Sequence, residues 1–240
     1  MANFGFHRLA VVAPYEAHWR EARSAVQAEE LLRNAKRTES LNDAVADCTL
    51  VLGTGTLAHR KPQQPVVALP DLRQRVAKEL GRGGRVALVF GPEKRGLTRE
   101  DLSLCHLLVE IPTAPSQPSM NLGQAVAVCL YELAARLPSA GESAAAPHSG
   151  RTLSRREKSG NEDLAQPSGS DSGVAAPAGD LERLAAVVEK TMLAANYSPA
   201  ATRKANRHDL RLFLRRLALT GQDARRILGL FRRILWRLEH

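Results

Sequence analysis

Ser119 and Asn121 stand two residues apart at the start of the apolar stretch PSMNLGQAVAVCLYELAARL, which spans residues 118–137. A hydroxyl and a carboxamide at this spacing can hold a substrate through hydrogen bonds. Ser or Asn before a helix is also a common N-cap, whose side-chain oxygen accepts from free backbone amides. One oxygen is enough for a cap, so the two residues can start a helix and still belong to a site.

Loops with glycine and polar residues follow three apolar runs: GTGTLAHR after residue 52, GPEKRG after Phe90, and PTAPSQPSMNLG after Ile111. Glycine lets a ligand approach the backbone amides closely. Glu93, in the second loop, can accept hydrogen bonds from Arg or Asn. The order of residues is neither that of a phosphate-binding P-loop nor that of a Rossmann fingerprint. The loops therefore indicate a binding site without a nucleotide motif.

Alternating strand and helix patterns position these loops between residues 7 and 138. Short apolar runs predict strands, and amphipathic stretches predict helices. The expected strands span residues 8–14, 49–55, 85–91 and 106–112, and the expected helices span 40–48, 69–80 and 97–105, with Ser40 and Thr98 as N-caps. This order predicts an α/β fold with a parallel sheet and helices on both faces. Ligands of such sheets lie beyond the carboxyl ends of the strands, where the three loops meet.

The composition changes after residue 138. Residues 139–179 are rich in Ser, Ala, Gly and Pro and contain no aromatic residue, which predicts a disordered linker. Helical periodicity then returns in residues 180–196, 203–219 and 221–239. Thr220 with Asp223 predicts the start of the last helix. Its expected apolar stripe consists of Ile227, Phe231, Ile234 and Leu238.

Most of the net charge of +9 lies near the C-terminus, because residues 199–240 contain eleven Lys and Arg but three acidic residues. A solvated helical face is one interpretation. So lopsided a balance instead favours an anionic partner, either nucleic acid or an acidic membrane surface. The cations expected to contact this partner are Arg203, Lys204, Arg207, Arg225, Arg226, Arg232, Arg233 and Arg237.

The three cysteines, Cys48, Cys105 and Cys129, are far apart and form no pair with metal-ligand spacing. We therefore expect no metal and a reduced, cytoplasmic location. No apolar window approaches the length of a membrane span. The histidines at positions 7, 59 and 106 are interpreted as surface or packing residues.

The segments ALVFGPEKRGLT at residues 87–98 and IPTAPSQPSMNLGQAVAVCLYE at residues 111–132 together resemble the SPOUT superfamily of AdoMet-dependent RNA methyltransferases. Within it, they are most similar to the TrmH/TrmJ branch of ribose 2′-O-methyltransferases. The resemblance extends over residues 3–138, and RILGLFRRILWRL resembles the helical tail of TrmJ-type tRNA enzymes. It implies a parallel sheet with a C-terminal deep trefoil knot, and a small all-α C-terminal domain. The expected domains are a SPOUT methyltransferase domain (1–138), the linker (139–179) and a basic helical RNA-binding domain (180–240).

The resemblance also implies roles for the loop residues. AdoMet would be held mainly by backbone groups, at Thr54, Gly55, Thr56, Gly91, Ile111, Pro118, Ser119, Met120 and Leu122. Ser119 and Asn121 would fix the reacting ribose and the knot loop, while Glu93 would orient catalytic groups. The expected activity is 2′-O-methylation of a tRNA ribose in the anticodon loop, by a homodimer joined through the knot helices. The alternatives are an rRNA substrate and a non-catalytic RNA-binding protein.

One part of the family pattern is absent. In this branch, an arginine in a motif of the form N-x-G-x-x-x-R acts near the ribose hydroxyl, but the sequence begins with MANFGFHRLAVVAP. We therefore expect either a start further upstream or a shortened relative that binds AdoMet and tRNA but transfers methyl groups poorly. Arg8, Arg60 and Arg95 are the cations nearest the matched loops that could replace the arginine.

Overall fold

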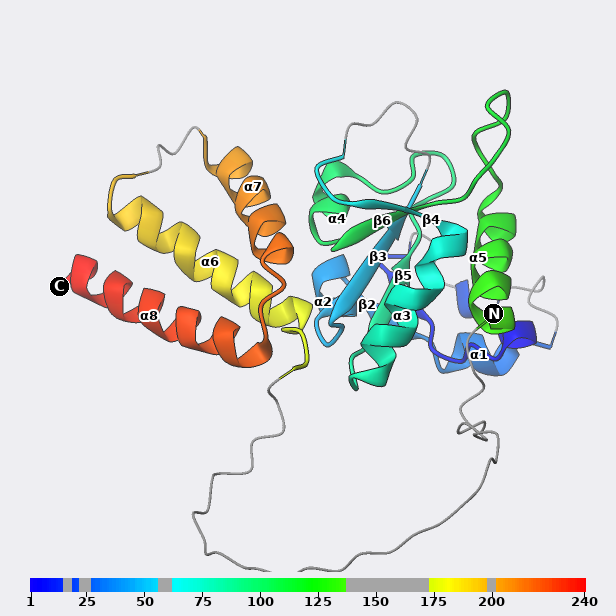
Figure 1. Cartoon of the computed structure of the whole chain (residues 1–240), viewed down its shortest axis with the longest axis horizontal. Coiled ribbons are helices and arrows are strands. Elements are labelled where there is room, and N and C mark those ends of the chain that lie inside the picture. The colour runs from blue at the N-terminus through cyan, green and yellow to red at the C-terminus, as the bar shows by residue number, and fades with distance from the viewer. Residues whose placement is uncertain (15–18, 22–26, 56–61, 137–172, 198–201) are drawn as a thin grey trace, which may run out of the picture.

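The structure, a computed structural model, describes residues 1–14, 19–21, 27–55, 62–136, 173–197 and 202–240 (Figure 1). A four-stranded parallel sheet has the order β4-β6-β3-β5, and a second parallel sheet pairs β1 with β2. Helices α6, α7 and α8 lie together at one side of the larger sheet (Figure 1). The predicted α/β fold with a parallel sheet is confirmed.

Short apolar runs form the strands of the larger sheet. The strands are β3 (Leu50–Thr54), β4 (Val66–Ala68), β5 (Val86–Val89) and β6 (Leu107–Glu110). In the central strand β3, Leu52 pairs with Leu88 of β5 and with Leu107 of β6. All but β4 lie within predicted strands. β4 has three residues, too few to show a periodicity.

Polar side chains cap several helices of the α/β part, which comprises the described residues up to position 136. The helices are α1 (Glu29–Arg33), α2 (Leu41–Val45), α3 (Leu72–Gly81), α4 (Arg99–Ser103) and α5 (Leu122–Arg136). Ser40 and Thr98 accept hydrogen bonds from the amides of Asp43 and Asp101, so both predicted caps are confirmed. The Asp101 carboxylate also accepts from the Thr98 amide and completes a capping box.

Side chains of the strands alternate between the two faces of the sheet. Leu52 and Leu107 pack with residues of α3 and α5 in one apolar cluster. Their neighbours Val51 and Leu108 point to the opposite face and pack with α2 and with Ala178, at the start of α6. Helices therefore cover both faces, as the alternating pattern predicts.

Short elements complete the N-terminal part. The smaller sheet consists of β1 (Ala10–Val12) and β2 (Lys36–Thr38), and single 3-10 turns occur at Ala2–Phe4, Trp19–Glu21 and Leu69–Asp71. β1 lies within a predicted strand. β2 has the polar sequence KRT, which shows no apolar pattern, and is therefore not predicted.

Helices α6 (Ala178–Ala194), α7 (Arg203–Arg216) and α8 (Gly221–Glu239) follow the three predicted C-terminal helices closely. Leu184, Val188 and Leu214 form their shared core with residues of α8. Residues 173–179 are expected in the linker, yet they are packed: the amides of Ala178 and Gly179 donate to Cys48 and Ala46 at 2.8 and 2.9 Å. The helical segment, whose described residues are 173–197 and 202–240, thus begins earlier than the composition indicates.

The expected apolar stripe of α8 is buried along part of its length. Ile227 and Phe231 pack against the helical core, whereas Ile234 and Leu238 of the same stripe are 39% and 46% exposed. α8 extends beyond the helices that cover its first half (Figure 1). Thr220 caps it as predicted, accepting from the Asp223 amide. Among the described residues, no helix is long and apolar enough to cross a membrane.

Candidate functional site

The loops that follow β3, β5 and β6 leave the same edge of the larger sheet, because the three strands are parallel neighbours. Gly55 follows β3, Gly91 and Glu93 follow β5, and Ile111 follows β6. The segment that continues from Ile111 leads directly to α5. The three loops predicted to form the site therefore begin at the same carboxyl edge of the sheet.

Asn121 connects two of these loops. Its side-chain nitrogen donates to Oε1 of Glu93 at 2.6 Å. Its side-chain oxygen accepts from the amides of Gly123 and Gln124 at 2.9 and 3.3 Å, which caps α5. The amide is thus held from both ends, and the N-cap and the contact with the second loop coexist.

Glu93 and Ser119 are exposed at this edge. Glu93 lies in a tight turn in which the amides of Arg95 and Gly96 donate to the carbonyl of Pro92. Within the described part of the chain, its second carboxylate oxygen and the Ser119 hydroxyl have no hydrogen-bond partner. These groups are available to a ligand.

The two glycines of the site differ in their surroundings. A Cβ at Gly91 would lie 2.1 and 2.3 Å from the backbone of Gly96 and Leu97, so the turn itself requires glycine there. A Cβ at Gly55 would meet no atom of the described residues within 4 Å. The close approach that the sequence predicts at Gly91 is therefore already made by the protein backbone, whereas Gly55 borders open space.

The other expected cofactor positions fall into two groups. Thr54 is buried, and its hydroxyl donates to the carbonyl of Val89 at 2.8 Å, so only its backbone faces the edge. Ile111 is partly buried and packs against the sheet core, Met120 and Leu122 are also partly buried, and Pro118 is exposed. Thr56 lies outside the described residues, as does Arg60.

The buried thiols and the partly buried His106 are not suited to acid–base chemistry. Burial raises the pKa of Cys105 to about 12 and of Cys48 and Cys129 to about 11, which keeps the thiols protonated. Burial, aided by the nearby Arg215, lowers the pKa of His106 to about 3. Its Nδ1 accepts from the Val51 amide at 3.1 Å, so His106 is a packing residue, as interpreted.

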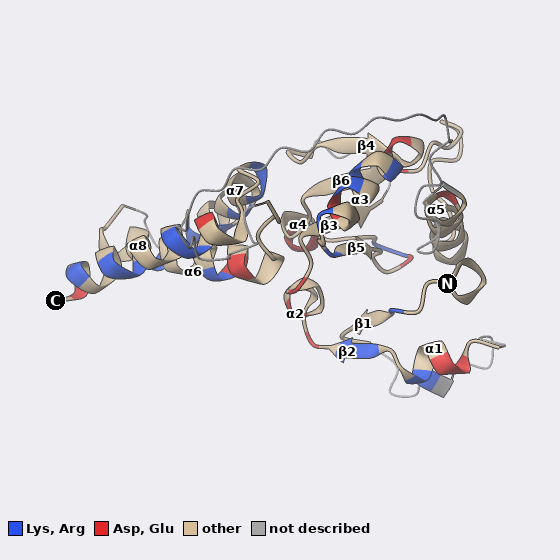
Figure 2. Ribbon diagram, turned by 60° about the horizontal axis from the view of Figure 1, so that its bottom comes forward, with Lys and Arg blue, Asp and Glu red and all other residues tan. Residues whose placement is uncertain are grey.

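Lys and Arg residues are frequent along α7 and α8 (Figure 2). Among the expected RNA contacts, Arg203 donates to the Glu189 carboxylate at 2.9 Å and remains half-exposed. The remaining seven are exposed: Lys204, Arg207, Arg225, Arg226, Arg232, Arg233 and Arg237. The structure thus leaves the predicted basic surface open to solvent.

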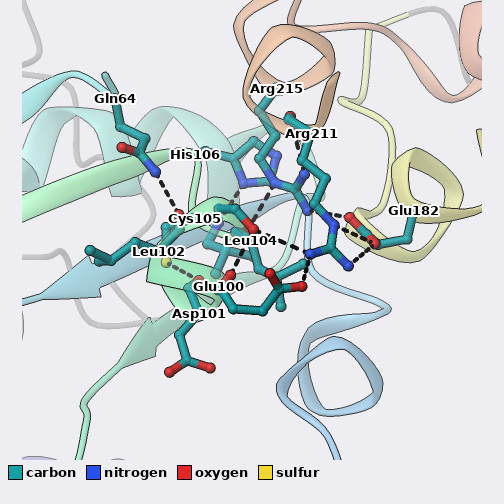
Figure 3. Close-up of polar contacts among 12 residues, drawn as sticks. Gln64, Glu100, Asp101, Leu102, Leu104, Cys105, His106, Glu182, Arg211 and Arg215 are labelled. Carbon is teal, nitrogen blue, oxygen red and sulfur yellow. Dashed lines mark hydrogen bonds and ion pairs between the residues drawn. The ribbon is translucent and has the colours of Figure 1, made fainter. Parts of the chain in front are cut away.

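Two arginines of the same segment have a different role. Arg211 and Arg215, each 5% exposed, both pair with the buried carboxylate of Glu182 (Figure 3). Arg211 continues to Glu100, and Arg215 donates to the carbonyl of Leu104 at 3.0 Å. This buried ion-pair network joins α6 and α7 to α4 of the α/β part. Spacing alone would not reveal it, because Arg215 and Leu104 are 111 positions apart.

The parallel sheet and its three loops define an α/β protein with a ligand site at the carboxyl edge. Residues 1–131 match the SpoU rRNA Methylase family, and the chain belongs to this family.

Curated relatives resemble the same part of the chain. A Haemophilus influenzae protein named "Uncharacterized tRNA/rRNA methyltransferase" is 35% identical over 133 residues, which are 55% of this chain and 54% of that protein. The "tRNA (cytidine-2'-O-)-methyltransferase TrmJ" of Methanocaldococcus jannaschii is 38% identical over 135 residues, 55% of this chain and 58% of that protein. The matched stretch thus spans about half the length of these relatives.

A solved structure, TrmJ from Z. mobilis ZM4, superposes with a TM-score of 0.74 over 100% of this chain and 90% of that chain. The sequence identity is 24%, so this likeness concerns the fold alone. It includes the C-terminal helices, because the superposition covers the whole chain.

Proposed function

We propose that this chain transfers a methyl group from AdoMet to a ribose 2′-hydroxyl of tRNA. The observation that carries the proposal is the hydrogen bond between Asn121 and Glu93, which ties the loop before α5 to the loop after β5. Membership of the SpoU family supports the reaction class. The names of curated relatives support tRNA as the substrate, and the family description makes rRNA the second candidate.

The carboxyl edge fits AdoMet in one respect that can be checked. Gly55 borders open space, so a ligand can lie against the backbone at the end of β3. AdoMet, when bound, supplies an activated methyl group on a sulfonium. The exposed hydroxyl of Ser119 and the backbone of residues 118–122 would line the opposite side. AdoMet would contact the cofactor positions predicted from the sequence. At Thr54 the contact would be with the backbone, because the side chain is buried.

Positioning is the work left to this chain's own residues, because the methyl donor is already activated. Glu93 holds the Asn121 amide, and α5 holds the other end of that amide, so neither group swings freely. The free carboxylate oxygen of Glu93 and the Ser119 hydroxyl can then orient a ribose hydroxyl or a cation that helps to remove its proton. Of the candidate cations Arg8, Arg60 and Arg95, Arg95 is nearest to Glu93 in sequence and lies in the same turn.

The larger assembly remains a proposal. We divide the chain into a methyltransferase domain up to residue 138 and an RNA-binding helical segment from residue 173 on. A linker between them rests on composition alone, since residues 137–172 lie outside the described ones. The trefoil knot around residues 111–132, a homodimer through α5 and a cytoplasmic location belong to the same proposal. Tyr131 of α5, 59% exposed, supports a contact surface on that helix.

Transfer of labelled methyl from AdoMet to bulk tRNA tests the function, with purified rRNA in a parallel reaction. We expect label in tRNA. The phosphodiester bond on the 3′ side of the labelled nucleotide should resist alkaline cleavage, because its 2′-hydroxyl is methylated. Label in rRNA only would make rRNA the substrate. Binding of tRNA without any transfer would leave a non-catalytic RNA-binding protein.

Two variants test the site. Gly55→Ala places a methyl group in open space, so it should weaken AdoMet binding about tenfold, as judged by calorimetry, without unfolding the protein. Gly81→Ala, at a second glycine with open surroundings, is the matched control and should bind AdoMet normally. Equal affinities in the two variants would place the cofactor elsewhere.

A further inference from the structure

An open groove lies where the helical segment meets the α/β part. It has a volume of about 440 Å³. One wall comes from Gln63 and the turn after β5, and the opposite wall comes from His208 and Leu212 of α7. The groove is distinct from the contact between Asn121 and Glu93, although Arg95 belongs both to its wall and to the turn that carries Glu93.

The groove has cationic walls and an apolar floor. Arg95, Arg99 and His208 supply the polar atoms, while Leu97, Leu102 and Leu212 supply much of the apolar surface. Nε of Arg99 donates to Nε2 of His208 at 3.3 Å, which leaves the terminal nitrogens of this guanidinium to other acceptors. Burial, followed by the nearby Arg99, lowers the pKa of His208, so its ring is neutral near pH 7.

Carboxylates are absent from the described lining of the groove. Three acidic residues adjoin the lining in sequence: Glu100 pairs with Arg211, Asp101 completes the cap at Thr98, and the exposed Asp209 follows His208 on α7. Arg99 is the charged residue of α4 among the lining residues. The resulting charge favours an anionic occupant.

Both walls are held in place by interactions on either side of the groove. Gln64 donates to the carbonyl of Leu102 at 2.6 Å and fixes the segment before β4 against α4 (Figure 3). On the other side, Arg211 and Arg215 anchor α7 through Glu182 and the carbonyl of Leu104. The groove is therefore a built feature of the docked arrangement, and it exists because α7 rests on α4.

We infer that this groove binds a single-stranded segment of the RNA substrate, next to the nucleotide that is methylated. Phosphates would lie on Arg99 and Arg95, and a ribose or base would cover the apolar floor formed by Leu97 and Leu102. The inference rests on the proposed function, and it connects the exposed cations of α7 to the turn that carries Glu93. An RNA strand that runs from α7 through the groove to the turn with Glu93 would contact positively charged residues along its whole path.

A charge placed inside the groove tests this path. Gln63 is exposed in its wall, so Gln63→Glu changes the charge without changing the shape. Gln74→Glu, on the exposed side of α3, is the matched control. At 0.1 M salt one phosphate contact contributes about five- to eightfold to affinity, so Gln63→Glu should weaken binding of bulk tRNA by about that factor. Gln74→Glu should leave it unchanged.

Removal of a cation gives an independent measurement. Arg99→Gln should lower the slope of log affinity against log salt by about 0.7 to 0.9, whereas Arg73→Gln on α3 should not. AdoMet affinity should stay the same in all four variants. Equal tRNA affinities for each variant and its control would overturn the proposal that the groove binds RNA, but not the proposed function. A loss confined to AdoMet binding would make the groove part of the cofactor site. A native protein that binds no tRNA would overturn the proposed substrate as well.

Discussion

The α/β part and the helical segment use arginine in opposite ways. In the α/β part the buried clusters consist of apolar side chains, and Arg73, Arg75 and Arg82 lie on the surface. In the helical segment, Arg211 and Arg215 are buried while the arginines of α8 are exposed. The net charge of the sequence therefore overstates the positive charge on the surface of the helical segment, because two of its arginines are buried.

The buried arginines also explain why the two parts dock. Apolar contact between them is small: Ala178 inserts beside Val45 and Val51. Glu182 then supplies one carboxylate for two guanidinium groups. Glu100 and the Leu104 carbonyl accept further hydrogen bonds from Arg211 and Arg215, respectively. Buried charges are tolerated only when they are paired in this way.

The largest effect should follow from Glu182→Ala. The change leaves Arg211 and Arg215 without their shared carboxylate in a buried place. Loss of one partner of a buried pair costs about 3–5 kcal/mol, so the free energy of unfolding should fall by that amount in a denaturant titration. Glu239→Ala, at the exposed end of α8, should change it by less than about 0.5 kcal/mol. Similar values for both would show that the network does not hold the docked state.

A second variant should disturb the α/β part through shape instead of charge. In Gly91→Ala the new methyl group meets the backbone of Gly96 and Leu97, which cannot rotate away. Overpacking of this kind costs about 3 kcal/mol at its upper end. The free energy of unfolding is the readout, with Gly55→Ala as the control because its methyl group meets nothing. A stable Gly91→Ala protein that has lost only AdoMet affinity would return Gly91 to the role that the sequence suggested.

The regular elements could be predicted from sequence because each carries its own local signal. β3, β5 and β6 are continuous apolar runs, and the caps at Ser40, Thr98 and Thr220 are marked by an acid three residues later. β2 and β4 lack such a signal, since three residues show no period and β2 is polar. They form because a neighbouring strand pairs with them. That pairing depends on the tertiary structure, so the local sequence does not reveal it.

The site was predictable in its parts but not in its connections. The loops that hold Glu93 and Asn121 could be selected from residue types, but the contact between positions 28 apart needs the fold. In the sequence, Arg211 and Arg215 only add to the basic charge of residues 199–240, because the carboxylate that pairs with them lies on another helix. The groove formed by Arg99 and His208, 109 positions apart, has no local pattern at all.

A smaller effect concerns pH. Since the pKa of His106 is about 3 in the folded protein and about 6.5 in the unfolded chain, the unfolded state binds the additional proton between these values. Stability from this group is complete above about pH 6.5 and falls as the pH drops toward 3. Its share of the loss between pH 7 and pH 5 is about 2 kcal/mol. In His106→Gln the unfolding free energy should depend less steeply on pH across this window. An unchanged dependence would place the ring in contact with water.

The smallest effect on stability, and the largest on RNA, should come from the exposed arginines of α8. Replacement of Arg226, Arg232, Arg233 and Arg237 by Gln removes four charges that have no buried partner, so the free energy of unfolding should change by about 0.5 kcal/mol or less. If these cations meet phosphates, the slope of log tRNA affinity against log salt should fall by roughly three. The matched control replaces Arg73, Arg75, Lys78 and Arg82 on α3, which removes the same charge from the α/β part. Equal slopes for the two variants would mean that RNA responds to net charge alone. A flattened slope for the α8 variant only would assign the electrostatic contact to the segment whose other arginines are structural.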